Sequence, residues 1–188
     1  MNLYVALLRG VNVGGRNRLP MRELVSILES VGCRNVHTYV QSGNAVFESA
    51  TPDRQSLSRE VAGEIRERLG FAPHVLLLSL ADLERAIADN PFPEGEADPA
   101  HLQLGFLESE PLHPDTNKLN SLRSATERFH LTGGVLYLYA PDGIGTSKLA
   151  ATAEKLLCVP MTSRNWTTVT RLWDMARALA RGRDVGDR

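Results

Sequence analysis

The chain has 188 residues, of which 43% are hydrophobic and 23% charged, and its formal net charge is −1. This length suffices for one large domain or two small ones, with a buried core that needs no disulfide staples. The apolar content excludes a disordered chain. The small net charge excludes a uniformly basic coat for nucleic acid and a strongly acidic tail.

The amino-terminal segment is apolar over residues 3–8 and ends at Arg9 and Gly10. It has no basic leader and is too short for a signal peptide or a membrane span, so it predicts a buried strand. The two cysteines, Cys33 and Cys158, lie far apart, and we expect reduced, mostly buried thiols rather than a disulfide scaffold. These features favour a cytoplasmic protein without a membrane segment.

In the first half of the chain, apolar periodicity alternates with turn and cap signals. Pro20 suits the first position of a helix that a glycine ends, and the Ser-Gly-Asn sequence at 42–44 suits a hairpin turn. Thr51, Pro52 and Asp53 suggest a helix cap, a first helical residue and an acid facing the helix dipole. The expected elements are a strand at 3–8, a Gly- and Asn-rich loop at 10–19, a helix at 20–31, strands at 36–40 and 45–48, a helix at 51–69, a strand at 74–78 and a helix at 79–88.

The second half repeats this order after a segment rich in proline. Residues 90–100 hold three prolines and a glycine, which predicts a linker that is neither helix nor central strand. Two glycines at 133–134 then predict a second hairpin turn. The expected elements are a strand at 102–107, a helix at 114–124, strands at 128–131 and 135–139, a helix at 146–157, a strand at 161–163 and a helix from 165 onward.

Each half therefore runs strand-helix-strand-strand-helix-strand-helix, and its first six elements follow the split βαβ pattern. We predict an α+β fold built by internal duplication of two ferredoxin-like (βαββαβ, alpha-beta plait) subdomains, each with an extra C-terminal helix. The predicted boundaries are 1–89 for the first subdomain, 90–100 for the linker, 101–180 for the second subdomain and 181–188 for a flexible tail.

Three predicted strands, at 3–8, 75–78 and 135–139, are apolar at nearly every position, which is typical of sheets covered on both faces. An RNA-recognition motif needs an open sheet face that carries aromatic residues, so this pattern argues against one. The aromatic residues of these strands are expected in the core instead: Tyr4, Phe47, Tyr137 and Tyr139.

Charge is unevenly distributed along the chain. Residues 1–34 carry five arginines against two acids, residues 82–115 carry nine acids against one arginine, and residues 146–183 carry seven bases against two acids. Two basic regions therefore flank an acidic middle, and pairing between them is one plain explanation of the basic residues.

Their positions suggest a second explanation. Bases precede or begin three predicted helices, where the helix dipole disfavours a cation unless an anion lies nearby. Free backbone N–H groups, glycines and a cation together are a common way to hold phosphate or carboxylate. Residues 9–18 and 143–148 combine these features, although neither segment matches a P-loop or a G-x-G-x-x-G motif. The bases concerned are Arg16, Arg18, Lys148 and Arg164.

Signals for other chemistry are weak. The five histidines are scattered without metal-ligand spacing, and no G-x-S-x-G elbow occurs. We predict no metal site and no cofactor and assign no catalytic residue; His37 and His130 are candidate bases by residue type alone.

The segment Leu-Leu-Arg-Gly-Val-Asn-Val-Gly-Gly at 7–15 resembles a bacterial family known as domain of unknown function 1697. Val11, Leu19 and Ala45 replace other aliphatic residues of the family, and every polar motif residue is retained. The resemblance implies two ferredoxin-like subdomains and brings no established activity, substrate or cofactor. Further stretches that carry it lie at 17–21, 39–44, 90–92, 147–149 and 162–169.

The leading hypothesis is a binding protein for a phosphorylated or carboxylated ligand, such as a nucleotide or an RNA end. The alternatives are an enzyme acting on such a ligand and a protein-interaction module without a small-molecule site. The expected partner is an anionic small molecule or a nucleic-acid fragment, with no membrane, and the sequence carries no signal for an oligomeric state. The candidate ligand-binding residues are Arg9, Asn12, Gly14, Gly15, Arg16, Asn17, Arg18, Gln41, Ser42, Asn44, Lys148, Arg164 and Asn165.

Topology limits this hypothesis. In a ferredoxin-like unit, the helices after the first and third strands start at one sheet edge, whereas the helix after the fourth strand starts at the other. Lys148 and Arg164 are therefore expected to share a site only if the packing of the two halves brings Arg164 to the Arg16 loop.

Overall fold

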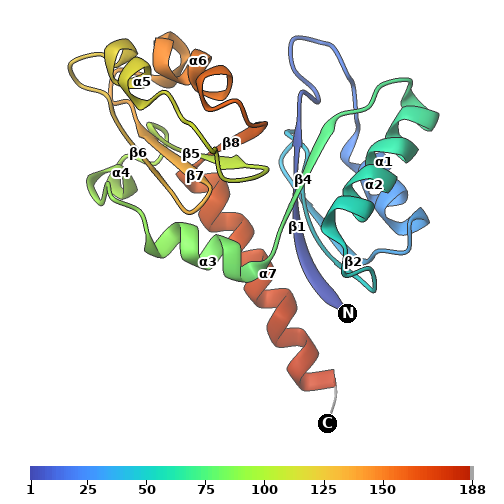
Figure 1. Ribbon diagram of the computed structural model, residues 1–188. Helices are drawn as coiled ribbons and strands as arrows, with labels where there is room; N and C mark the ends of the chain where they lie inside the picture. The colour runs from blue at the N-terminus through green and yellow to red at the C-terminus, as the bar shows by residue number, and fades with distance from the viewer. Residues whose placement is uncertain (187–188) are drawn as a thin grey trace. The chain divides into compact units, whose positions relative to one another are not determined.

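The computed structural model describes residues 1–186, which form a mixed α/β fold with two four-stranded antiparallel sheets and seven α-helices (Figure 1). The chain divides into two compact units of similar build. One comprises Met1–Glu84 together with the carboxyl-terminal segment from Arg171, and the other comprises Arg85–Thr170. The strand-helix-strand-strand-helix-strand-helix order predicted for each half is confirmed.

The first sheet has the strand order β2-β3-β1-β4, and all neighbouring strands are antiparallel. Helices α1 and α2 cover one face, where alternate strand residues such as Tyr4, Ala6 and Leu8 form a core with the apolar residues of both helices (Figure 1). The elements are β1 (Asn2–Arg9), α1 (Met21–Ser30), β2 (Arg34–Tyr39), β3 (Asn44–Ser49), α2 (Arg54–Leu69), β4 (His74–Leu78) and α3 (Leu80–Ala88).

The second sheet repeats this arrangement with the order β6-β7-β5-β8. The core of this unit consists of alternate strand residues, such as Leu136 and Leu138, packed against apolar residues of α5 and α6. The elements are α4 (Glu94–Ala97), β5 (Leu102–Leu107), α5 (Thr116–Leu122), β6 (Arg128–Thr132), β7 (Val135–Tyr139), the 3₁₀ helix η1 (Ile144–Thr146), α6 (Lys148–Leu157), β8 (Met161–Asn165) and α7 (Trp166–Gly186).

The prediction that the central strands are buried on both faces is confirmed in β1. Tyr4, Val5, Ala6, Leu7 and Leu8 are each at most 4% exposed, although only every second one faces α1 and α2. The aromatic residues behave similarly, since Tyr4, Phe47 and Tyr137 are buried and Tyr139 is half-buried. The first three rings are core residues, as predicted, whereas Tyr139 is only partly covered.

Two local expectations are wrong. The cap of α2 is Asp53 rather than Thr51, because its Oδ1 accepts hydrogen bonds from the amides of Gln55 (2.9 Å) and Ser56 (3.2 Å). The predicted linker contains the single helical turn α4, whose N-cap is Pro93; the first turn of a helix needs no N–H donor, so proline is accepted there.

Helix α7 extends into the segment predicted as a tail. Helix α7 continues to Gly186, and residues 187–188 lie outside the described part of the chain. Gly182 lies inside this helix, and an interior glycine costs only about 1 kcal/mol relative to alanine, which does not by itself end a long helix.

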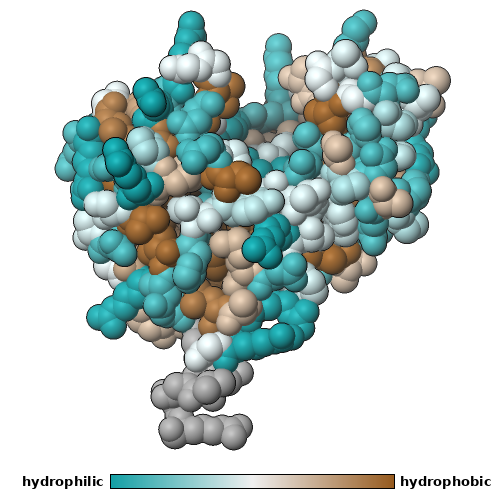
Figure 2. Space-filling model, turned by 180° about the vertical axis from the view of Figure 1, so that it is seen from behind, coloured by the Kyte–Doolittle hydropathy of each residue, from teal (hydrophilic) through white to brown (hydrophobic). Residues whose placement is uncertain are grey.

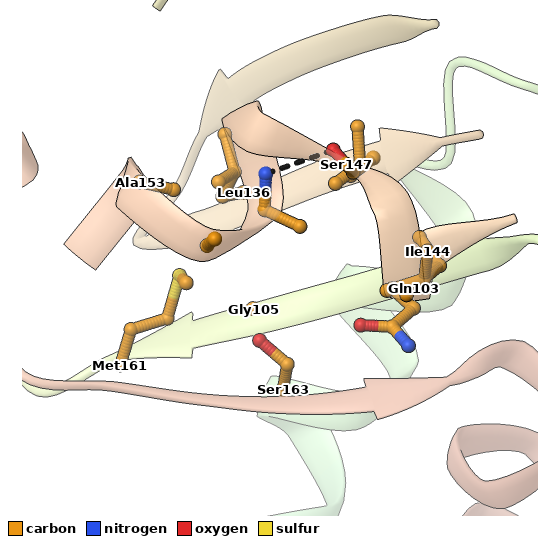
Figure 3. A pocket seen from close by; sticks show the side chains of 12 residues that line it. Gln103, Gly105, Leu136, Ile144, Ser147, Ala153, Met161 and Ser163 are labelled. Carbon is orange, nitrogen blue, oxygen red and sulfur yellow. Dashed lines mark hydrogen bonds between the residues drawn. The ribbon is translucent and has the colours of Figure 1, made fainter.

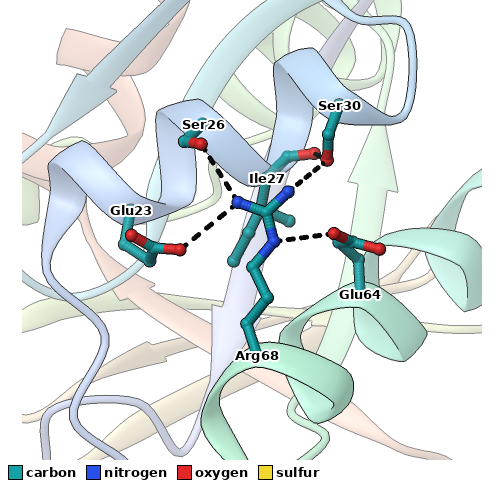
Figure 4. Close-up of polar contacts among 6 residues, drawn as sticks. All are labelled: Glu23, Ser26, Ile27, Ser30, Glu64 and Arg68. Atoms are coloured by element: carbon teal, nitrogen blue, oxygen red, sulfur yellow. Dashed lines mark hydrogen bonds and ion pairs between the residues drawn. The ribbon is translucent and has the colours of Figure 1, made fainter.

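Arg68 links the two helices that cover the first sheet (Figure 4). Its guanidinium donates to Glu64 Oε1 (2.6 Å) on α2 and reaches across to α1. There it contacts Glu23 Oε1 (3.3 Å), Ser26 Oγ (3.0 Å) and Ser30 Oγ (2.8 Å). One side chain therefore uses its fork of donors to hold two turns of a neighbouring helix.

We expect Arg68→Ala to lower the melting temperature by about 2 °C at low salt, because four contacts are lost together. Arg66→Ala is the matched control, since Arg66 is exposed in the same last turn of α2. The difference between the two variants should shrink at high salt, where exposed ion pairs are screened. Equal melting temperatures for both variants would show that the Arg68 contacts add nothing to stability.

The surface of the protein carries both hydrophilic and hydrophobic residues. On the face drawn in Figure 2, hydrophobic residues form small separate groups among hydrophilic ones. None of the helices in the described part of the chain is long and apolar enough to cross a membrane.

Candidate functional site

The loop between β1 and α1, residues 10–19, folds as a miniature hairpin. Asn12 donates its amide hydrogen to the Asn17 carbonyl (3.0 Å), and Arg16 donates to the Val13 carbonyl (3.0 Å). Gly14 (φ +56°) and Gly15 (φ +75°) lie between Val13 and Arg16, and positive φ at both central residues defines a type I′ turn. The two glycines are therefore needed for the turn itself.

Two asparagines hold this β1–α1 loop in shape. The Asn12 side-chain amide donates to the carbonyls of Leu19 (2.8 Å) and Gln41 (2.7 Å), and its Oδ1 accepts from the Leu19 amide (2.8 Å). Asn17 donates in the same way to the Gly10 carbonyl (2.9 Å). Both residues have φ values near +50°, which asparagine tolerates better than most residues. Asn12, predicted to orient a ligand, thus uses its side-chain donors and acceptor to hold the loop.

The turn between β2 and β3, residues 40–43, lies against this loop. The Leu8 amide donates to the Gly43 carbonyl (2.8 Å), and the Asn12–Gln41 bond ties the turn to the loop. Asn44 is fully buried and donates to the Tyr39 carbonyl (3.1 Å) and Ser42 Oγ (2.8 Å). The candidate residues of the first half therefore come together at one end of the first sheet, with Asn44 in an internal role.

The exposed groups at this end are mainly cationic or polar. Arg16 and Arg18 are exposed beside the Gly14–Gly15 tip, and no side chain caps the amino terminus of α1, which follows directly. Guanidinium groups remain charged at any physiological pH and match the geometry of phosphate and carboxylate oxygens. This arrangement suits the binding of an anion. The remaining exposed candidates here are Arg9, Asn17, Gln41 and Ser42.

The candidates of the second half are arranged differently. In the β5–β8 register, Gly105 pairs with Ser163 and Leu104 pairs with Arg164, so Ser163 and Arg164 face opposite sides of the sheet. Lys148 is the exposed first residue of α6, which covers the face that carries Ser163. Lys148 and Arg164 are therefore separated by the second sheet and do not form one site within this unit.

Arg164 and Asn165 also have structural roles. Arg164 donates from Nη1 to the Ser163 carbonyl (2.8 Å), and burial lowers its pKa to about 10, so it remains a cation at neutral pH. Asn165 Oδ1 accepts from the Thr168 amide (2.9 Å) and caps α7, as the sequence predicted for the start of this helix.

A pocket of about 330 Å³ lies between the second sheet and the start of α6 (Figure 3). Its lining includes Gln103, Gly105, Ser147, Met161 and Ser163 and no charged residue. Ser147 is committed to capping α6, since its Oγ accepts from the Ala150 amide (3.0 Å). Sequence reasoning missed this pocket; the available signal was Gly105 in the middle of a strand, where a glycine marks a close approach of another group, here the Met161 side chain.

Metal and nucleophile chemistry find little support among the described residues. They contain no group of three or more His, Cys, Asp or Glu side chains that could hold a metal ion. Cys33 is buried, and burial raises the pKa of its thiol to about 11, so it is protonated at neutral pH. Cys158 is exposed, contrary to expectation, and both thiols are free.

The fold and the site define a protein of two similar α/β units, one of which carries a basic, glycine-tipped loop. The family described as "Protein of unknown function (DUF1697)" matches residues 1–137, and the chain belongs to this family. A solved structure, that of the conserved bacterial protein SP0830 from Streptococcus pneumoniae, is similar at 25% sequence identity. It has a TM-score of 0.69 over 93% of this chain and 98% of that one. No curated protein matches the chain.

Proposed function

We propose that this protein binds a phosphorylated or carboxylated ligand at the end of the first sheet, on the β1–α1 loop. The observation that carries the proposal is that Arg16 and Arg18 lie exposed beside a Gly-Gly turn. The internal hydrogen bonds of Asn12 and Asn17 hold the loop before any ligand arrives. A preorganised site loses less conformational entropy on binding, so a few charged contacts suffice.

Polar neighbours on the β2–β3 turn support the same proposal. Gln41 and Ser42 are exposed and tied to the loop through the Asn12–Gln41 bond (2.7 Å). Neutral donors beside guanidinium groups suit a phosphate ester, whose oxygens accept several hydrogen bonds at once.

The test is a titration with AMP and with inorganic phosphate at low salt, followed by the melting temperature, because a ligand that binds only the folded state raises it. We expect Arg16→Ala and Arg18→Ala each to weaken binding by about tenfold through loss of a charge-assisted contact. Arg66→Ala removes the same charge from exposed α2 and serves as the control. No shift with either ligand, or equal losses in all three variants, would contradict the proposal.

Two finer assignments belong with it. We propose that both units are ferredoxin-like alpha-beta plaits; the order β4-β1-β3-β2 with a helix after the first and third strands supports this. We also propose the cytoplasm as the location, which the two free thiols support.

A further inference from the structure

Val40, in the β2–β3 turn, has an unusual backbone conformation. Its φ is +50°, in the left-handed region that β-branched side chains strongly disfavour. Three of the other non-glycine residues with positive φ are asparagines, which tolerate this region, and Val40 is the only β-branched one in the described part of the chain. Asparagine or glycine would satisfy this turn with less strain.

Burial of the Val40 side chain contributes little free energy to offset this backbone strain. The residue is 50% exposed, so much of its apolar surface stays in water. Residues with a strained backbone conformation cluster at active sites and ligand-binding sites. An exposed valine in a strained position therefore suggests a contact that is made only when something binds.

A second exposed valine lies on the neighbouring β1–α1 loop. Val13, at the tip of the β1–α1 loop, is 66% exposed. Each valine is next in sequence to one partner of the Asn12–Gln41 hydrogen bond (2.7 Å), which brings the two segments together. Val13 pairs with Arg16 in an antiparallel β-bridge at the tip of the loop, so an exposed apolar and an exposed cationic residue lie side by side there.

We infer that the anion bound here carries an apolar, flat group that packs on Val40 and Val13, as in an aryl phosphate or a nucleoside monophosphate. This inference rests on the proposed function and specifies its ligand class. Two valines provide apolar surface for one ring, far less than the roughly 800 Å² per partner that a stable protein interface buries. A small phosphate ester is therefore the partner that fits.

The experiment compares inorganic phosphate with phenyl phosphate by NMR titration of the ¹⁵N-labelled full chain, following the amides of Gly14, Gly15 and Gly43. Phenyl phosphate should bind about tenfold more tightly than inorganic phosphate because its ring covers apolar side chains. Val40→Asn should remove most of this advantage, leave the phosphate affinity unchanged and keep or raise the melting temperature, since asparagine accepts the turn.

The possible outcomes separate the two proposals. Equal binding of both ligands by the unchanged protein, or a tenfold advantage that survives in both Val40→Asn and Val13→Thr, overturns the inference and leaves anion binding intact. If neither ligand perturbs the three glycine amides, the proposed function fails and this inference fails with it. Val13→Thr has nearly the shape of valine, so its effect isolates apolarity from size.

Discussion

Replacing Gly43 with alanine is expected to reduce the free energy of unfolding of the first unit by about 3 kcal/mol. Gly43 has φ +73°, where an alanine costs about 1–2 kcal/mol. A Cβ built there would lie 2.7 Å from Val11 Cγ2 and 2.8 Å from Leu8 Cβ, and such overpacking costs about 1–3 kcal/mol. The Gly43 carbonyl accepts from the Leu8 amide (2.8 Å), so the turn cannot move away without losing that bond.

Urea unfolding, followed by circular dichroism, measures this effect, and Gly14→Ala is the matched control. Gly14 also has positive φ (+56°), but a Cβ there would meet open space, so only the backbone strain of about 1–2 kcal/mol applies. The difference between the two variants therefore reports the contact between Gly43 and its two apolar neighbours. Equal losses in both variants would show that this contact is not tight.

Replacing Asn12 should have a similarly large effect, because one side chain makes three hydrogen bonds. Asn12→Gly keeps the positive φ allowed and removes the amide, and we expect a loss of about 2–3 kcal/mol at about 1 kcal/mol per bond. Asn12→Ala should lose about 1 kcal/mol more, since alanine is strained at φ +55°. Both variants should also weaken anion binding, because the loop no longer holds Arg16 and Arg18 in place.

Hydrogen exchange at the Leu19 amide gives a direct measurement, since this amide donates to Asn12 Oδ1 (2.8 Å) and lies in a buried residue. Its exchange should become faster in Asn12→Gly. Asn17→Gly is the control, because it removes a single bond, to the Gly10 carbonyl, and should cost about 1 kcal/mol. Unchanged protection of Leu19 in the Asn12 variant would contradict the structural role of this side chain.

Much of the fold was predictable from local pattern. Strands β4, β5 and β7 have the predicted bounds. Each is a short apolar run between turn signals, a pattern typical of a buried strand. The hairpin at Gly133 and Gly134 was equally clear, since both residues have positive φ as a type I′ turn requires. Local errors arose where several residues compete for one role, as Thr51 and Asp53 do for the cap of α2.

The location of the candidate site was predictable from the sequence, whereas the roles of its individual residues were not. Glycines, asparagines and arginines in one short segment pointed to the β1–α1 loop, because those residue types suit tight turns and anions. Their individual tasks depended on distant partners. Asn12 meets Gln41, 29 residues away, and thereby becomes part of the scaffold. The strain at Val40 cannot be read from the sequence, since it depends on the φ of the turn and not on residue type alone.

The number and order of the strands, six of the seven α-helices and the segment that concentrates cations near glycines all follow from the sequence alone. Periodicity and turn chemistry are local, so they can be read without the fold. Only the tertiary structure decided which polar groups remain exposed. Packing of α6 on the sheet face that carries Ser163 left Arg164 on the opposite face, and the β1–β3 pairing brought the β2–β3 turn to the end of β1. Hydrogen bonds and burial between residues far apart in the chain set these roles, and such contacts leave no periodic signal in the sequence.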